Sequence, residues 1–345
     1  MPAHDLLSRK PLIGLGTFPF ASPFSPVAEE TVAEIVNTYL GNGGYYIDTA
    51  PTYAFGEVER QLGRLLRAYD RSDFFINTSC GYVRSEDGKS FRISGKAEDV
   101  HNDLTESLDR LQLKHVDSYI SHIPDKDTPF GETVDALLEE KRIGRAKYIG
   151  VSNVTLDQLK EYNQDGAIDI VQNRFSHINR SIDPAFRKYC RDNGISIVAY
   201  QVIERGLLTE KKLDELAPAP DDLRSRKPEF AEQCRRIINR WVQGTLYKAI
   251  EQTGLSVTAF SIAWVLTHPE VHVAQVGSTN SMQLDALFEA HEYVHSIDSM
   301  SLELIETPYN ELVGQCLKET DFQTIRGMLG VEGSDSLSGL SASGR

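Results

Sequence analysis

The stretch VDSYISHIPDKDTPFGETVDALLEEKRIGRAKYIGV, residues 116–151, contains a complete strand–helix–strand unit. Val116 to Ser121 and Lys147 to Val151 are short runs rich in β-branched and aromatic residues, which is typical of buried strands. Between them, Glu132 to Arg142 has the apolar spacing of an amphipathic helix. Two such strands joined through a helix are expected to run parallel with a right-handed crossover.

The same alternation continues along the chain in both directions. Helical patterns cover residues 27–40, 57–69, 97–111 and 184–193, and Thr155 and Asp183 are candidate N-caps. Eight strand–helix units in sequence predict an α/β fold, a (β/α)8 TIM barrel that forms a single domain. Besides the two strands above, the predicted strands are Leu12 to Gly16, Tyr45 to Thr49, Phe74 to Thr78, Ile168 to Gln172, Ser196 to Tyr200 and His272 to Val276.

Two stretches do not follow this alternation of strand and helix patterns. Residues 206–232 are charged and contain prolines, which predicts a long loop before a helix at 235–253. The Ser- and Gly-rich residues 333–345 are expected to form a disordered tail after a barrel domain at 1–332.

Composition excludes several classes of protein. A chain of 345 residues with 40% hydrophobic content and no long apolar run is expected to be cytoplasmic, with no membrane partner. A net charge of −14 argues against nucleic-acid binding. Cys80, Cys190, Cys234 and Cys316 have no paired spacing and are expected to be free thiols. The oligomeric state is not predicted.

In a TIM barrel, the chemistry lies at the carboxyl ends of the strands. Polar residues follow most of the predicted strands and are therefore expected to converge on one rim. They include Asp48, Tyr53, His122, Ser152, Asn153, Gln172, Tyr200, Ser278 and Thr279.

Several of these residues belong to longer motifs. The motifs are GLGT (14–17), IDTAPTY (47–53), SLDRLQLKHVDSYISHIPD (107–125), GVSN (150–153), VQN (171–173) and GLLT (206–209). With them the chain resembles the aldo-keto reductase family from about Leu12 to about Ala290. The resemblance implies an NADP-dependent oxidoreductase that reduces a carbonyl, or oxidises an alcohol, of a small and moderately polar molecule.

The resemblance also implies roles for individual residues. Tyr53 would donate a proton to the substrate carbonyl, with Asp48 and His122 beside it. Ser152, Asn153 and Gln172 would hold the nicotinamide carboxamide, and Tyr200 would stack on the ring. The remaining cofactor contacts, to the phosphates and adenosine, would come from Gly277, Ser278, Thr279 and Gln283.

One catalytic position does not fit the family. Its members carry a lysine at the end of the third strand, whereas this chain reads Thr78-Ser79-Cys80-Gly81. A phenol has a pKa near 10 and needs a neighbouring cation to be a fast proton donor. A cation about 4 Å from a phenolate contributes about 4 kcal/mol at an effective dielectric constant near 20. Ser79 is therefore the residue that puts ordinary carbonyl reduction in question.

Three ways around the missing lysine stay open. Arg84, Lys89 or Lys96 could fold back from the loop after the third strand, His122 could donate the proton, or the reaction could need no acidic tyrosine. The third possibility keeps two alternative functions open. One is a nicotinamide-binding barrel with non-redox chemistry, that of a dehydratase, isomerase or lyase, and the other is a non-catalytic sensor subunit that binds nicotinamide.

Two further patterns bear on cofactor and metal. Thr279 and Gln283 are neutral where a 2′-phosphate favours Lys or Arg. The sequence HEYVH at 291–295 matches the HExxH zinc motif, but a helix after the eighth strand ends on the barrel face opposite the catalytic rim. No metal site is predicted.

Overall fold

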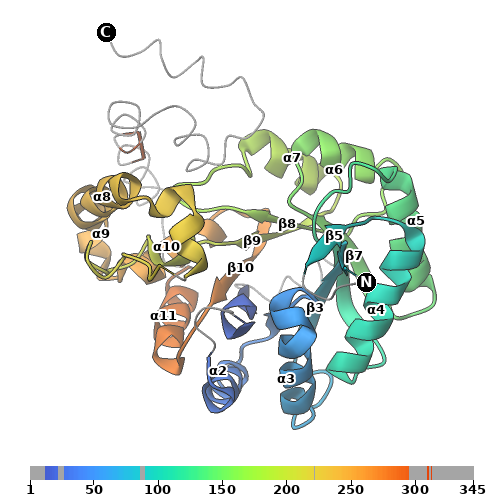
Figure 1. Cartoon of the computed structure of the whole chain (residues 1–345). Helices are drawn as coiled ribbons and strands as arrows, with labels where there is room; N and C mark the ends of the chain where they lie inside the picture. The colour runs from blue at the N-terminus through green and yellow to red at the C-terminus, as the bar shows by residue number, and fades with distance from the viewer. Residues whose placement is uncertain are drawn as a thin grey trace.

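Eight parallel strands close into a barrel in the order β1-β10-β9-β8-β7-β6-β3-β2 (Figure 1). The computed structural model describes residues 12–21, 27–85, 90–220, 222–294, 309, 310 and 312. The predicted single-domain (β/α)8 barrel is confirmed. Its strands are β1 (Leu12–Gly16), β2 (Tyr46–Asp48), β3 (Phe75–Cys80), β6 (Val116–Ser121), β7 (Ala146–Ser152), β8 (Ile170–Arg174), β9 (Ser196–Tyr200) and β10 (Val271–Gly277).

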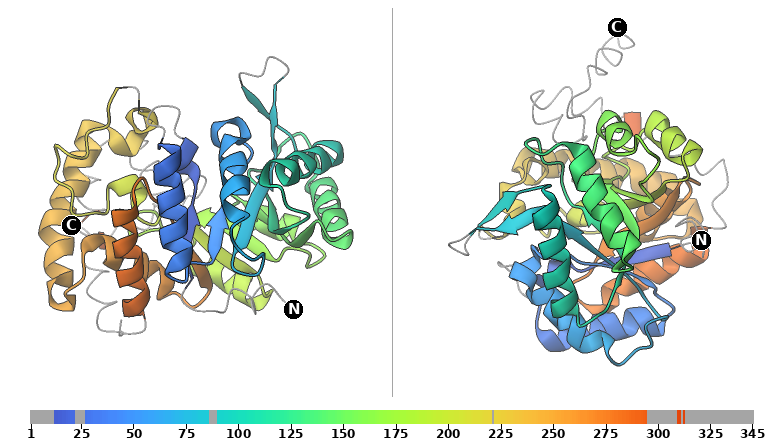
Figure 2. Two further views of the ribbon diagram at one scale, coloured as in Figure 1. Left: turned by 90° about the horizontal axis from the view of Figure 1, so that it is seen from below. Right: turned by 90° about the vertical axis from the view of Figure 1, so that its right-hand side faces the viewer.

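Helices surround the barrel, as both views in Figure 2 show. The caps expected at Thr155 and Asp183 are present, because each side chain accepts a hydrogen bond from a backbone N–H of the first turn. The outer helices are α2 (Glu29–Gly41), α3 (Glu57–Leu66), α4 (Ala97–Leu111), α5 (Phe130–Arg142), α6 (Leu156–Tyr162), α7 (Pro184–Asp192), α10 (Val257–Leu266) and α11 (Asp285–Tyr293).

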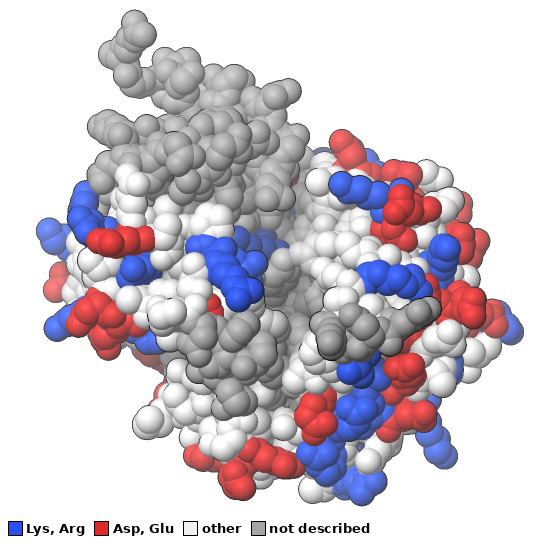
Figure 3. Space-filling view, viewed as in Figure 1, with Lys and Arg blue, Asp and Glu red and all other residues white. Residues whose placement is uncertain are grey.

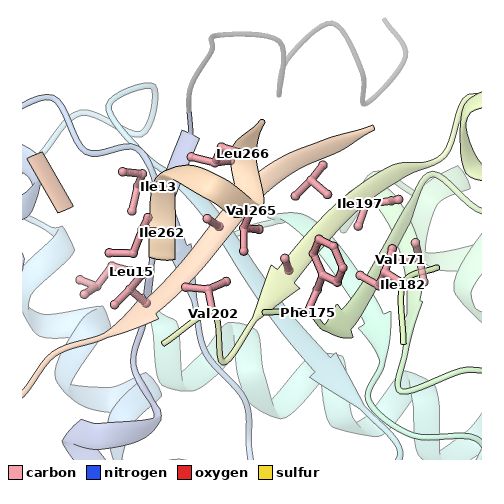
Figure 4. Packing of buried hydrophobic residues seen from close by; sticks show 14 of the residues in the cluster. Ile13, Leu15, Val171, Phe175, Ile182, Ile197, Val202, Ile262, Val265 and Leu266 are labelled. Atoms are coloured by element: carbon pink, nitrogen blue, oxygen red, sulfur yellow. The ribbon is translucent and has the colours of Figure 1, made fainter. Parts of the chain in front are cut away.

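No amphipathic pattern predicts the helix α10, because α10 has no polar face. Every residue of α10 except Thr258 is buried, and a helix that is apolar all round belongs in a protein interior. Its side chains Ile262, Val265 and Leu266 lie among those of the neighbouring strands (Figure 4).

The segment after β9 is more structured than the predicted loop. Residues 204–230 contain three short 3₁₀ turns, η3 (Glu204–Gly206), η4 (Leu223–Arg226) and η5 (Pro228–Phe230). The helix predicted at 235–253 begins earlier and is divided into α8 (Glu232–Trp241), a π-helical turn η6 (Val242–Leu246), α9 (Tyr247–Ile250) and a 3₁₀ turn η7 (Glu251–Thr253).

A β-hairpin that the sequence did not predict follows β3. Strands β4 (Tyr82–Arg84) and β5 (Phe91–Ile93) pair antiparallel and project from the barrel (Figure 2). Each strand has three residues, too few for a period-two pattern to be recognised. The ring of Phe91 stacks on that of Phe55, with 5.0 Å between ring centroids, so the hairpin covers the loop that carries Tyr53.

The interior of the barrel is layered. Its lower layer is apolar, and within it the rings of Tyr46, Phe75 and Tyr148 stack in sequence; we call these three residues the aromatic floor. Alternate residues of a strand point to the same side, so the residues two positions after Tyr46 and Phe75 point inward above that floor. They are Asp48 and Asn77, and Gln275 joins them from β10. Gly16 makes room for this layer, because a Cβ there would lie 2.9 Å from Nε2 of Gln275.

Three expectations from the sequence concern other parts of the chain. Cys80, Cys190 and Cys234 are buried and form no disulfide within the described residues, and Cys316 lies outside the described residues. No described helix has the length and apolar character needed to cross a bilayer. The expected disordered tail at 333–345 also lies outside the described residues.

Candidate functional site

Asp48, at the end of β2, accepts hydrogen bonds from amides and forms no ion pair with a lysine, arginine or histidine of the described residues. Its side chain is 2% exposed. Oδ1 accepts hydrogen bonds from Nδ2 of Asn77 at 2.8 Å and Nε2 of Gln172 at 3.2 Å, and Oδ2 accepts one from Nε2 of Gln275 at 2.7 Å. Burial raises the pKa of Asp48 to about 6, although these hydrogen bonds oppose the rise. Asp48 is thus a buried carboxylate whose negative charge is stabilised only by dipoles.

Tyr53 lies beside Asp48 at the start of the turn η2 (Tyr53–Gly56). Burial, followed by the negative charge of Asp48, raises the pKa of Tyr53 well above its usual value of 10. No lysine or arginine of the described chain contributes to the pKa of either group. The tyrosine is therefore protonated at neutral pH, and its phenolate is unfavourable.

Ser79 and His122 are hydrogen-bonded to each other. The distance from Oγ of Ser79 to Nδ1 of His122 is 2.8 Å. Burial lowers the pKa of His122 to about 4, so the imidazole is neutral at pH 7. The ring of His122 meets those of Tyr53 and Tyr82 edge-on, with centroid distances of 6.4 and 5.3 Å. The position of the family's lysine thus carries a hydroxyl that orients a neutral histidine.

A small cavity of about 10 Å³ lies between these residues. Two of its lining residues have a buried side-chain oxygen without a hydrogen-bond partner in the described structure, Oγ1 of Thr49 and Oε1 of Gln172. The lining residues are Asp48, Thr49, Tyr53, Asn77, Ser79, Ile120, His122, Ser152 and Gln172.

The cations proposed as substitutes for the lysine lie elsewhere. The Arg84 guanidinium is 5.0 Å from the centroid of the Phe55 ring, on the hairpin. Lys96 precedes α4 and helps to lower the pKa of Asp125. Lys89 lies outside the described residues. Neither described candidate supplies charge to Tyr53.

The ends of β7, β8 and β9 bring the residues expected to hold the carboxamide together. Oγ of Ser152 donates to the carbonyl oxygen of Gln172 at 2.8 Å, and Nδ2 of Asn153 donates to the carbonyl oxygen of His122 at 2.8 Å. The hydroxyl of Tyr200 donates to Oδ1 of Asn153 at 2.5 Å. Asn153 adopts a φ of 60°, in the left-handed region that Asn tolerates better than most residues.

The loop after β10 is held by hydrogen bonds between its own residues. Oε1 of Gln283 accepts hydrogen bonds from the backbone N–H of Thr279 at 2.9 Å and from Oγ of Ser278 at 3.2 Å. Residues 277–283 include no charged side chain. In this arrangement the loop offers a phosphate neutral donors only. Figure 3 shows acidic and basic side chains intermingled over the outer helices on one face, and a central hollow that is bordered on its left by basic side chains.

The part of the chain that the structure describes contains no cluster of His, Cys, Asp and Glu that could hold a metal ion. Of the HExxH pattern, His291 and Glu292 lie on α11, and His295 falls outside the described residues.

Sequence reasoning missed Asn77 and Gln275. A signal was present in each case, because Asn77 precedes Ser79 by two positions and Gln275 precedes Gly277 by two, so each shares an inward face with a residue already considered. A polar residue on the inner face of a barrel strand is uncommon enough to draw attention.

Comparison with known proteins agrees with this architecture. The sequence profile of the aldo/keto reductase family matches residues 12–306. The chain is 30% identical over 278 residues to the aldo-keto reductase YhdN of Bacillus subtilis, covering 80% of this chain and 84% of that protein. It is 31% identical over 250 residues to the NADH-specific methylglyoxal reductase of Escherichia coli, covering 69% and 76%. The fold is similar to that of the glycerol dehydrogenase AKR11B4 from Gluconobacter oxydans, with a TM-score of 0.79 and 23% identity over 87% of this chain and 92% of that one.

Proposed function

Because this chain belongs to the aldo/keto reductase family, whose members are oxidoreductases acting on small-molecule carbonyls, we propose that it is an NADP-dependent carbonyl reductase or alcohol dehydrogenase. The observation that carries the proposal is the meeting of Asp48, Tyr53 and His122 around one cavity beside Gln172. These residues come from three different strand ends, those of β2, β6 and β8, and in a TIM barrel that is where catalytic groups gather.

The residues at the ends of β7 to β9 fit a nicotinamide. The unpartnered Oε1 of Gln172 is an acceptor suited to a carboxamide NH2 group. Ser152 and Asn153 lie next to it, and Tyr200 presents a ring at the end of β9. A bound dinucleotide would supply or accept the hydride at this place.

The protein's part in the reaction is to orient the substrate oxygen and to move its proton. As hydride reaches the carbonyl carbon, the Tyr53 hydroxyl gives its proton to the carbonyl oxygen, and in the oxidation direction it takes the proton back. The neutral His122, oriented by Ser79, hydrogen-bonds the same oxygen. Without a cation at position 79 the phenolate that forms is costly, so we expect slow turnover.

NADP is the cofactor that we propose. The resemblance favours it, and among the similar proteins the aldo-keto reductase yakc of Schizosaccharomyces pombe carries NADP(+) in its name, whereas the E. coli methylglyoxal reductase is NADH-specific. The neutral loop at 277–283 predicts a modest preference between the two forms. Titration of the protein with NADPH and NADH, followed by cofactor fluorescence, measures this preference.

The test of the function combines binding with turnover. Wild-type protein should quench NADPH fluorescence and consume NADPH with at least one member of a panel that includes methylglyoxal and glyceraldehyde. Tyr53→Phe should lower the rate by about 10²- to 10⁴-fold, because it removes the proton donor, and should leave NADPH binding unchanged. Tyr247→Phe, an exposed position on α9, is the control and should match the wild type.

Two outcomes would contradict the proposal. Binding of NADPH without turnover on any carbonyl or alcohol would favour the non-redox enzyme or the sensor subunit. Absence of any nicotinamide binding would refute all three functions.

A further inference from the structure

The cavity below Tyr53 has the size of a single small particle. Its volume of about 10 Å³ is close to the minimum that holds one water molecule. Potassium and ammonium ions are of nearly the same size as water. The cavity lies beside Ser79, where a lysine in the family would place its ammonium group.

The charge around the cavity is unbalanced. Asp48 is 2% exposed and pairs with no lysine, arginine or histidine of the described chain. Three amides supply only dipoles to it. An ionised carboxylate buried without a counter-charge is costly, so this place attracts a cation.

The lining also presents oxygen atoms that suit a cation. Oγ1 of Thr49 has no hydrogen-bond partner although the residue is 1% exposed, and it lines the cavity. The hydroxyls of Ser79 and Ser152 belong to the same lining and keep acceptor lone pairs beyond the hydrogen bonds that they make. Hydroxyl and carboxylate oxygens are the donors that hard cations prefer.

We propose that this cavity binds one water-sized monovalent cation, ammonium or potassium, which stands where the lysine ammonium of the family would stand. A divalent ion fits the cavity poorly. Magnesium gives up its waters reluctantly and usually keeps several of them, whereas this space of about 10 Å³ holds one particle beside one carboxylate.

The bound cation has two consequences. It neutralises Asp48 in the folded protein, with or without cofactor. Its use in catalysis rests on the proposed function, because a positive charge next to Tyr53 stabilises the phenolate that proton donation leaves behind.

The first experiment tests the site itself in the absence of cofactor. Thermal unfolding is measured in ammonium, potassium and choline chloride at one fixed ionic strength. We expect the unfolding midpoint to rise by about 2–4 °C in ammonium or potassium relative to choline, and to saturate with concentration. Equal midpoints in all three salts would overturn the proposal, because choline is too large for the cavity.

A crystal of the protein soaked in thallium(I) acetate locates the ion. Thallium(I) mimics potassium and scatters X-rays anomalously. An anomalous peak between Asp48 and Thr49 supports the proposal, and a water molecule at that position with no peak refutes it.

Two variants separate the cation from general effects of salt. Thr49→Val keeps the shape of the side chain and removes one oxygen, and should weaken the apparent affinity for ammonium by about ten-fold. Thr38→Val on α2 is the matched control and should leave the affinity unchanged. Equal affinities in wild-type and Thr49→Val protein would place the cation elsewhere.

The last experiment tests whether the bound cation contributes to the reaction. Ammonium should raise the turnover of the wild type, and Ser79→Lys should raise it by up to about 10³-fold and abolish the response to ammonium. If Ser79→Lys fails to fold, the comparison of Thr49→Val with Thr38→Val still answers the question. Cation-specific stabilisation without turnover would sustain the site and refute the oxidoreductase. Turnover that is indifferent to cations would sustain the oxidoreductase and refute the cation's part in catalysis, and the unfolding midpoints and the thallium peak decide the site itself.

Discussion

Buried carboxylates have different partners in the outer parts of this molecule and inside its barrel. Glu59 is fully buried and receives Nε of Arg110 at 2.6 Å. Asp117, Glu140 and Glu204 are also buried, and each forms an ion pair with an arginine. Asp48 is buried to a similar degree and has amides in place of a cation. Of the buried carboxylates that the structure describes, only Asp48 and Asp125 form no ion pair, and Asp125 is held by the Thr128 hydroxyl and two backbone N–H groups near Lys96. Among these residues, a buried carboxylate without a cation nearby is thus found at the candidate site.

The largest expected effect lies in the outer layer. Arg110→Met keeps the aliphatic part of the side chain and leaves Glu59 with a single hydrogen bond from Thr78. Removing one partner of a buried ion pair should lower the free energy of unfolding by about 3–5 kcal/mol, measured by urea denaturation. Arg142→Met, which breaks an exposed pair with Glu139, is the control and should change nothing measurable. If Arg110→Met leaves the free energy of unfolding unchanged, an unpaired buried carboxylate is tolerated in the outer layer as well.

An intermediate effect is expected at Gln275. Gln275→Met removes the donor to Oδ2 of Asp48 and preserves the length of the side chain. A hydrogen bond to a charged group contributes about 1.5–3 kcal/mol, so the free energy of unfolding should fall by that amount at pH 7.5. At pH 5 the loss should be smaller, because Asp48, with its pKa near 6, is then largely protonated. A loss that does not vary with pH would indicate that Gln275 acts through packing.

The smallest expected effect concerns the titration midpoint of Asp48. In choline buffer free of potassium and ammonium, the carboxyl of Asp48, followed by ¹³C NMR and assigned with Asp48→Asn, should titrate near pH 6. Because its pKa is raised on folding, the folded state binds more protons than the unfolded state between about pH 4 and 6, and stability falls as pH rises through that window. Tyr53→Phe should raise the midpoint by less than about one unit, since the tyrosine hydrogen bond lowers it slightly. A midpoint near 4 would reveal a cation beside Asp48 under the conditions of the measurement.

The barrel could be predicted because its signals are local. Alternating strand and helix patterns lie within windows of about 15 residues, and the helix at 97–111 was predicted with its observed bounds. The substitution at Ser79 could also be read, because it interrupts a short motif at a strand end.

The surroundings of Asp48 could not be predicted in the same way. Its three amide donors are 29, 124 and 227 positions away in the sequence. Only the closed register of the barrel brings them to one level, and a one-residue shift of any strand would turn its donor outward. The hairpin β4–β5 could not be predicted for a different reason. Its strands are too short to show an alternation of polar and apolar residues.

The aromatic floor of Tyr46, Phe75 and Tyr148 is buried and fills the barrel below Asp48. A small ion or a substrate would therefore approach Asp48 from the ends of the strands. A dinucleotide bound there, as we propose, would cover this route, so a small ion beneath it would have to bind before the cofactor and leave after it.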